Sequence, residues 1–200
     1  MAYVLGFFAA DGNIIRTKNG GFYISFYSSD KDLLLSILES MDSEHKLSQR
    51  KSESVYRFQI GSKEMFNDLI LLSFIPNKVK RMKLPIIPKK FTRHFIRGYF
   101  DGDGNVWSGI INRSRKNPTK VLQVAFTSSS KQFLEALLTL LKIEGINGGS
   151  LFKVNKKNCS RLMFSTLDAL KLYEIMYNVR DELYLARKKL VFEKFIKMRL

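Results

Sequence analysis

The sequence contains one cysteine, Cys159, and two histidines, His45 and His94, among its 200 residues. A single cysteine excludes an internal disulfide framework and fits an intracellular, reducing compartment. Zinc sites built by a protein need several cysteine or histidine ligands at suitable spacing, which disfavours zinc here. A metal bound by this chain is therefore expected to be a hard cation held by carboxylates.

Long apolar runs are also missing. No stretch approaches the ~20 apolar residues that a membrane-spanning helix needs. The first residues, Met1 to Gly6, lack the basic region that opens a secretory signal. The sequence therefore predicts a protein without a membrane partner.

Acidic residues are scarce relative to basic ones: 18 Asp and Glu stand against 34 Lys and Arg, a net charge of +16. Hydrophobic residues make up 45% of the chain, which distinguishes it from a basic disordered tail. Such a charge on a globular protein favours nucleic acid, because each phosphate contact releases condensed counterions. A basic protein without such a partner, or one bound to an anionic membrane surface, is the alternative; no convincing basic amphipathic helix supports the latter.

One pattern occurs twice. Residues 5–13, LGFFAADGN, return as RGYFDGDGN at residues 97–105. Residues 26–29 (FYSS) return as 126–129 (FTSS), and residues 56–62 (YRFQIGS) match 161–166 (RLMFST). Pro85 and Pro88 exclude a continuous helix between the copies. The chain is thus predicted to contain a first half at 1–85, a linker at 86–94 and a second half at 95–200.

Both halves show the same order of elements. An apolar helix ends at each Asp-Gly, where the glycine can adopt the left-handed cap conformation. Residues 22–26 and 121–126 alternate as strands do. Asp30 and Ser130 are expected to cap the helices that follow. We predict an α+β fold with the order αββαββα in each half, the last helix of the first half being short or irregular.

Each acidic helix has small residues at a spacing of four, which places them on one face and allows another backbone to approach closely. They are Gly6 with Ala10, and Gly98 with Gly102. Helices that pair through these faces would bring Asp11 and Asp103 together. Two carboxylates at helix C-termini repel each other and the helix dipole, and a divalent cation offers a reason to retain them. Asp-Gly is also an ordinary helix stop, but its repetition favours a functional pair.

The two segments resemble the two motifs of LAGLIDADG homing endonucleases, in the monomeric form with two motifs per chain. The motifs are residues 4–12 (VLGFFAADG) and 96–104 (IRGYFDGDG), and the resemblance covers nearly the whole chain. It implies pseudo-twofold αββαββα halves, motif helices at the interface, and antiparallel sheets that form a saddle on the major groove of a long, asymmetric double-stranded DNA site. It also implies double-strand breaks made by metal-dependent phosphodiester hydrolysis, for intron or intein homing.

By this resemblance, Asp11 and Asp103 are the catalytic acids that bind Mg²⁺, for which Mn²⁺ substitutes. Backbone carbonyls near Ala10 and Gly102 would help to coordinate the ions. The first motif has Ala9 where the second has Asp101, which implies functionally unequal halves.

The resemblance further implies a basic residue after the second strand pair and helix of each half, which orients water or stabilises developing charge. Lys78 and Lys188 match that position, with Lys80 and Arg187 as neighbouring competitors and a solvated surface charge as the alternative. Ser29 and Ser129 match polar residues that contact water near the site, although ordinary strand-to-helix turns would explain them equally well.

Outward strand positions and the loops at 17–21 and 114–120 are predicted to contact DNA. The first-half candidates are Asn13, Arg16, Lys18, Tyr23, Ser25, Ser29, Arg57 and Gln59. The second-half candidates are Trp107, which fits a core position equally well, Asn112, Arg113, Arg115, Gln123, Ser129, Lys153 and Arg161. A maturase that binds intron RNA, or a non-catalytic DNA-binding protein on the same fold, is the competing function. The retention of Asp11 and Asp103 favours the nuclease.

Overall fold

The computed structural model describes residues 1–49, 54–76, 82–154, 158–178 and 183–199. Contacts divide the chain into two compact units, Met1–Gly102 and Asp103–Leu200. The second motif helix is therefore grouped with the first unit, although the sequence repeat assigns it to the second half. The predicted bounds of the two halves and of the linker at 86–94 rest on the sequence repeat, and they stay a prediction.

The first unit is built around a four-stranded antiparallel sheet with the order β1-β2-β4-β3. Its elements are α1 (Ala2–Asp11), β1 (Gly12–Arg16), β2 (Phe22–Ser28), α2 (Lys31–Ser40), β3 (Ser48–Gln49), β4 (Tyr56–Gly61), α3 (Lys63–Leu71), the 3-10 helix η2 (Lys89–Phe91) and α4 (Thr92–Asp103), whose last residue begins the second unit. Helices α1, α2 and α3 contact the strands of this sheet.

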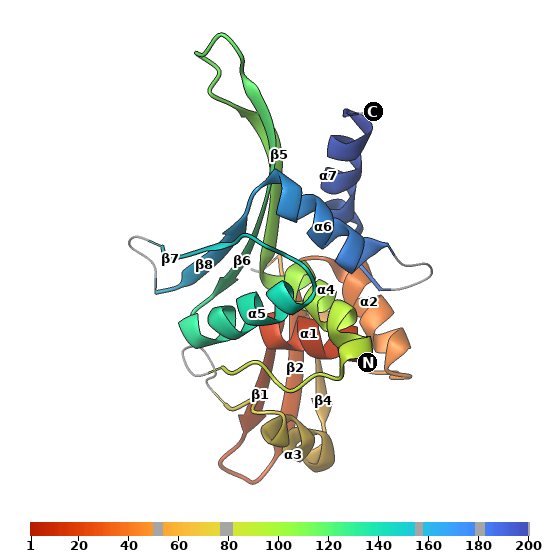
Figure 1. The fold of residues 1–200 in the computed structure, drawn as a ribbon. Coiled ribbons are helices and arrows are strands. Elements are labelled where there is room, and N and C mark those ends of the chain that lie inside the picture. The colour runs from red at the N-terminus through yellow and green to blue at the C-terminus, as the bar shows by residue number, and fades with distance from the viewer. Residues whose placement is uncertain (50–53, 77–81, 155–157, 179–182, 200) are drawn as a thin grey trace. The chain divides into compact units, whose positions relative to one another are not determined.

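The second unit repeats the sheet, with the order β5-β6-β8-β7. Its elements are β5 (Gly104–Ile111), β6 (Thr119–Ser128), α5 (Lys131–Ile143), β7 (Ser150–Lys153), β8 (Ser160–Phe164), α6 (Thr166–Tyr177) and α7 (Ala186–Lys197). Helices α5 and α6 contact β6, and α7 contacts β5 and α6. Figure 1 shows the β5–β6 hairpin extending beyond the other strands of its sheet.

The predicted α+β class and the αββαββα order are confirmed in both halves, with α7 as an addition to the second. Helix α3, with 9 residues, is shorter than its counterpart α6, with 12, as expected. Asp30 and Ser130 both occupy N-cap positions. Only the Ser130 side chain accepts a hydrogen bond there, from the backbone N–H of Phe133 at 3.2 Å. In the described part of the chain, no helix is long and apolar enough to cross a membrane.

Each sheet has one face packed against helices. Side chains alternate between faces along a strand, so the buried aromatic and aliphatic residues mark the inner face. These residues include Ile24, Phe26 and Phe58 in the first unit and Leu122, Val124, Phe126 and Leu162 in the second, all at most 3% exposed. The residues between them point to the outer face. This outer face is the one that bears on function.

The predicted left-handed helix cap at the first Asp-Gly is wrong. Gly12 has φ −97° and ψ 159°, an extended conformation, because the chain passes directly from α1 into β1. Glycine is needed there for space instead: a Cβ at this position would collide with the ring of Phe8. The turn signal in the sequence therefore marks a close contact with the core and not a positive φ.

Candidate functional site

The two motif helices pack against each other through reciprocal glycine contacts. A Cβ at Gly98 would collide with the carbonyl oxygen of Tyr3 and lie 2.9 Å from the backbone nitrogen of Phe7. A Cβ at Gly6 would collide with the carbonyl oxygen of Phe95 and lie 2.9 Å from the backbone nitrogen of Tyr99. Each glycine of the pair is therefore covered by the backbone of the other helix, which only a residue without a side chain permits.

The same packing brings the C-terminal end of α4 to Asp11. A Cβ at Gly102 would collide with the Cβ of Ala10 and lie 3.0 Å from Oδ2 of Asp11. Asp103, the next residue and the last of α4, is half-buried, as is Asp11. The small residues Ala10 and Gly102 are therefore what allows this approach.

The donor set at this position suits a hard cation, since carboxylate oxygens are the ligands that Mg²⁺ prefers. In the part of the chain that the structure describes, no group of three or more His, Cys, Asp or Glu side chains lies close enough to hold a metal ion. A cation at Asp11 would therefore complete its coordination with backbone carbonyls, water or oxygen atoms of a substrate. This is the arrangement in which Mg²⁺ keeps several waters and joins a protein to phosphate.

A buried polar network joins the helices at the position where the motifs differ. The hydroxyl of Tyr3 donates a hydrogen bond of 2.8 Å to Oδ2 of Asp101, whose side chain is 2% exposed. Arg97, one helical turn earlier and 1% exposed, lies over the Tyr3 ring and within 3.3 Å of Nδ1 of His94. Burial, followed by the Asp101 carboxylate, raises the pKa of Tyr3 well above its usual value of about 10. The spacing of Arg97 and Asp101 in an apolar helix is a signal in the sequence; nothing there indicates Tyr3.

Lys188 lies beside the start of β5. Its Nζ donates a hydrogen bond of 2.6 Å to the carbonyl oxygen of Gly104, the residue after Asp103, and the side chain is only 6% exposed. The solvated surface charge that was the alternative for Lys188 is thus excluded. Its competitor Arg187 is exposed. Lys78 and Lys80 lie outside the described residues, so their role stays a prediction.

Several predicted DNA contacts of the first half do occupy the outer face of their sheet. Asn13 pairs with Ser25 and Ser25 with Gln59, while Tyr23 and Arg57 occupy outward positions of β2 and β4. Lys18 and Ser29 are exposed in the segments that follow β1 and β2. Apart from Ser25, these residues are at least partly exposed, so a ligand of that face could contact them.

Two first-half predictions are wrong about accessibility or face. Ser25 is 0% exposed, because its small side chain sits on the middle strand between Asn13 and Gln59. Arg16 pairs with Phe22, and its guanidinium lies 5.4 Å from the centre of that ring, in the register of the inner face. A strand assigned one residue out of phase produces this kind of error.

In the second half, Trp107 is 44% exposed and pairs with Gln123 on the outer face, so the core alternative for Trp107 is excluded. Arg161 occupies the same face, pairing with Thr127 and Phe152. The turn after β5 exposes the remaining candidates of this loop, Asn112, Arg113 and Arg115.

Lys153 pairs with Ser160, in register with the inner face, so its predicted outward position is wrong, although the side chain is exposed at the sheet edge. Ser129 is half-buried, and at the two strand-to-helix turns the hydroxyls of Ser28 and Ser128 accept hydrogen bonds from the backbone N–H groups of Asp30 and Ser130.

The chemistry of both outer faces suits a polyanion. Among the described residues, no strand contains an Asp or Glu. Two buried side-chain polar atoms among the described residues have no hydrogen-bond partner, Oγ of Ser25 and Nε of Arg161, and both residues belong to these faces. Buried polar atoms are usually satisfied, so these two are exceptions among the described residues.

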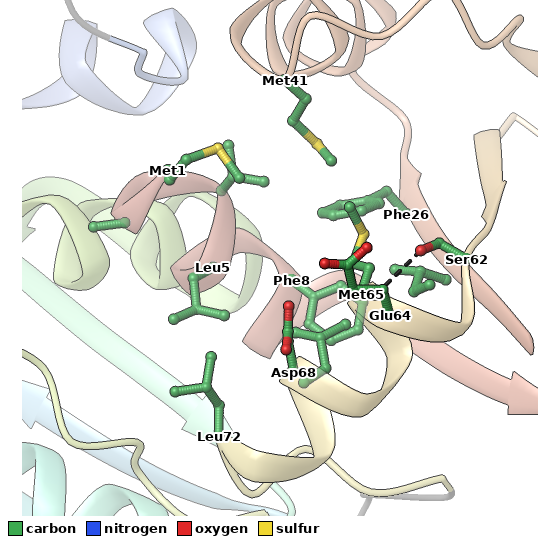
Figure 2. Close-up of a pocket in the computed structure, with 14 residues that line it drawn as sticks. Met1, Leu5, Phe8, Phe26, Met41, Ser62, Glu64, Met65, Asp68 and Leu72 are labelled. Atoms are coloured by element: carbon green, nitrogen blue, oxygen red, sulfur yellow. Dashed lines mark hydrogen bonds between the residues drawn. The ribbon is translucent and has the colours of Figure 1, made fainter.

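An apolar pocket of about 450 Å³ lies elsewhere in the first unit, between α1 and α3 (Figure 2). Leu5 and Phe8 of α1 face Met65 of α3 across it, and Met41 lies at its edge. Asp11 does not line this pocket. This apolar pocket is therefore separate from the acidic end of α1.

Comparisons with known proteins agree with this geometry. A model of the LAGLIDADG-like domain matches residues 1–70 and 90–176. The probable translation initiation factor IF-2 of Methanocaldococcus jannaschii is 31% identical over 147 residues, which is 70% of this chain and 11% of that protein. The IF-2 of Thermococcus kodakarensis is 30% identical over 112 residues, 52% of this chain and 8% of that protein. The chain thus spans about a tenth of the length of these relatives.

Solved structures show the same fold. The LAGLIDADG homing endonuclease I-LtrWI bound to target DNA matches with a TM-score of 0.64 at 14% identity, over 98% of this chain and 88% of that one. The meganuclease I-SmaMI bound to uncleavable DNA matches with a TM-score of 0.69 at 14% identity, over the same shares. The family model covers both motifs and most of the chain, and the chain belongs to the LAGLIDADG family.

Proposed function

We propose that the protein is a site-specific endonuclease that makes double-strand breaks in DNA by divalent-metal-dependent hydrolysis of phosphodiester bonds. The observation that carries this proposal is the glycine-mediated packing of α1 on α4. This packing brings Gly102, the residue before Asp103, against the Asp11 carboxylate. Such a concentration of negative charge is costly at a helix end and is explained by a cation.

In this proposal the carboxylates of Asp11 and Asp103, with backbone carbonyls at Ala10 and Gly102, would hold Mg²⁺, and Mn²⁺ would substitute. The bound cation supplies charge neutralisation and a more acidic water to phosphodiester hydrolysis. The protein's own contribution is positioning: the reciprocal glycines hold the ends of α1 and α4, and Lys188 holds the backbone that follows Asp103. The ammonium of Lys188 also places a positive charge beside the site, which favours an anionic transition state.

The DNA would lie on the outer faces of the two sheets. Strands without carboxylates avoid repulsion of phosphates, and the exposed basic residues of the β5–β6 turn extend the positive surface. Because the side chains of the two faces differ, the target is expected to be asymmetric and to be read by a single chain. Two of the similar structures, those of I-LtrWI and I-SmaMI, are complexes with DNA, which supports this assignment.

The curated relatives favour an intein-type context. In each IF-2 protein the matching segment makes up about a tenth of the length. A LAGLIDADG segment inside a much longer chain of other function fits an endonuclease carried within a host protein. We therefore infer that the activity serves homing of its own coding element, into the uninterrupted copy of a host gene.

The test has two steps: selection of bound duplexes from a random library without Mg²⁺, then incubation of the best duplex with Mg²⁺. We expect breaks in both strands with the full chain. Asp103→Asn should bind the duplex as tightly as the unmodified chain and cut it at least ~100-fold more slowly. Asp168→Asn is the matched control, because it makes the same change at an aspartate distant in the sequence from Asp11 and Asp103. The Asp168 carboxylate accepts hydrogen bonds from the backbone N–H groups of Asn147 and Gly148. Cleavage that survives Asp103→Asn, or tight binding only to structured RNA, would refute the proposal.

A further inference from the structure

The pairing registers make positions in the two sheets directly comparable. Gly12 pairs with Phe26 in the first sheet, and Gly104 pairs with Phe126 in the second, so these pairs are equivalent. The next row on the outer face crosses three strands in each sheet. It contains Asn13, Ser25 and Gln59 in the first sheet, and Asn105, Ala125 and Met163 in the second. This is the outer row nearest to the motif aspartates along the chain.

The two rows differ in chemistry. All three side chains of the first row carry hydrogen-bonding groups, whereas in the second row only Asn105 does, because Ala125 stands in place of Ser25 and Met163 in place of Gln59. The following position of the edge strand is apolar in both sheets, Ile15 in the first and the larger Trp107 in the second, where Trp107 pairs with Gln123. We call Trp107, Ala125 and Met163 the apolar strip of the second sheet.

The structure holds the Trp107 ring flat along this face. A Cβ at Gly109, two residues further along the same strand face, would collide with Cζ2 of the Trp107 ring and lie 2.7 Å from Cη2. The ring therefore lies over Gly109, and 44% of the Trp107 surface remains exposed. A large apolar side chain displayed in this way on a strand face has a partner outside the protein as its simplest explanation.

The charge around the apolar strip identifies that partner as DNA. The four strands of the sheet contain no carboxylate, and Arg113, Arg115 and Arg161 flank the strip from the β5–β6 turn and from β8. In the major groove, the thymine 5-methyl group is the apolar feature that a base pair presents. Ala125 and Met163 cannot hydrogen-bond to the amino and carbonyl groups of any base, so an apolar contact with the thymine methyl group is the favourable interaction that they can make there.

We propose that the apolar strip of the second sheet reads thymine 5-methyl groups, whereas the equivalent row of the first sheet reads hydrogen-bonding edges of bases. This inference rests on the proposed function, because it requires the outer faces to bind DNA. It assigns different readout chemistry to the two halves of the target.

Deoxyuridine tests this directly, because it lacks only the 5-methyl group and keeps every hydrogen bond of thymine. Duplexes are selected with the full chain, and the best one is resynthesised with deoxyuridine in one half, in the other half, or in neither. We expect deoxyuridine in one half to weaken binding about threefold to fourfold for each methyl group contacted. The same change in the other half should alter binding by less than about twofold.

Exchanging the rows provides the matched variants. The double variant A125S/M163Q gives the second sheet the chemistry of the first, and it should abolish the difference between thymine and deoxyuridine. The double variant S25A/Q59M should leave that difference intact in the sensitive half. Trp107→Gln changes one exposed side chain only, and should lower the difference even if the buried Ala125 position tolerates serine poorly.

Three results would overturn the inference. Equal affinity for thymine and deoxyuridine in both halves refutes methyl readout, even if the selected duplex is bound and cut. Discrimination that survives A125S/M163Q and Trp107→Gln refutes the assignment to the apolar strip. Failure to select any duplex refutes the inference together with the proposed function, so the two failures are distinguishable.

Discussion

Gly98→Ala is the perturbation that best tests the helix pairing on which the candidate site depends. The added methyl group would collide with the Tyr3 carbonyl oxygen and lie 2.9 Å from the nitrogen of Phe7, both backbone atoms of the opposite helix. Backbone atoms cannot rotate away as the end of a long side chain can. Relief therefore requires α1 and α4 to separate by roughly an ångström, as overpacking in close-packed interiors generally requires.

Two costs follow from that separation. Overpacking of this kind typically destabilises a protein by about 1–3 kcal/mol, which is a large share of the stability of a small domain. A displacement of about 1 Å of catalytic groups costs roughly 100-fold in rate. We therefore expect Gly98→Ala to lower both the melting temperature and the cleavage rate, the latter by two orders of magnitude or more.

Thermal melting by circular dichroism and single-turnover cleavage of a selected duplex measure the two effects. Gly61→Ala is the matched control: its Cβ would find the Tyr23 ring at 3.6 Å, an ordinary van der Waals contact, and Gly61 has no positive φ. The control should melt at or slightly above the temperature of the unmodified chain. If Gly98→Ala melts and cuts like the unmodified chain, the helices are not held by this glycine contact and the reasoning fails.

Lys188→Met should remove the hydrogen bond to the half-buried Gly104 carbonyl, at a cost of about 1 kcal/mol, and slow cleavage while binding persists; full cleavage would exclude a role in positioning. Tyr3→Phe should destabilise the protein by about 1–3 kcal/mol at neutral pH. Because the pKa of Tyr3 is raised in the folded state, the contribution of the Tyr3 hydroxyl to the free energy of unfolding is complete below pH ~10. This contribution is lost as the pH rises further. The melting temperatures of Tyr3→Phe and the unmodified chain should therefore converge above that pH, and a constant gap would contradict this. DNA binding should weaken about 10³-fold or more between 50 and 200 mM salt, and a flat response would exclude six or more phosphate contacts.

The parts of the fold that could be predicted are those in which a residue type at a given position has a single structural explanation. Glycine at a spacing of four in an apolar helix predicts close helix packing, and the contacts of Gly6 and Gly98 confirm it. Alternating strands and the serine N-cap at Ser130 were likewise predictable from local pattern. Lys188 was indicated only by the family resemblance, since nothing local shows that a lysine between Arg187 and Lys189 is buried.

The predictions are wrong at residues whose conformation or exposure depends on contacts with side chains around them in the folded structure. Gly12 looks like a cap but is required because the Phe8 ring occupies its side-chain space, a contact that no local pattern reveals. Ser25 is on the predicted face yet buried, because its accessibility depends on the longer side chains of two other strands. The error at Arg16 arises from the strand register. Moving one residue along a strand changes the face on which the side chain lies, and the contact with the Phe22 ring holds Arg16 on the inner face.

The division into compact units at Gly102, and not at the prolines between the repeats, has a consequence for how this chain can be divided into fragments. A fragment cut between the repeats would keep α1 but lose the helix that buries Tyr3 and Phe7, leaving an unpaired glycine face that would associate with a copy of itself. A cut at residue 102 would instead sever a helix one residue before its end. Neither repeat is therefore a self-sufficient module, and the two have to be expressed and engineered as one chain.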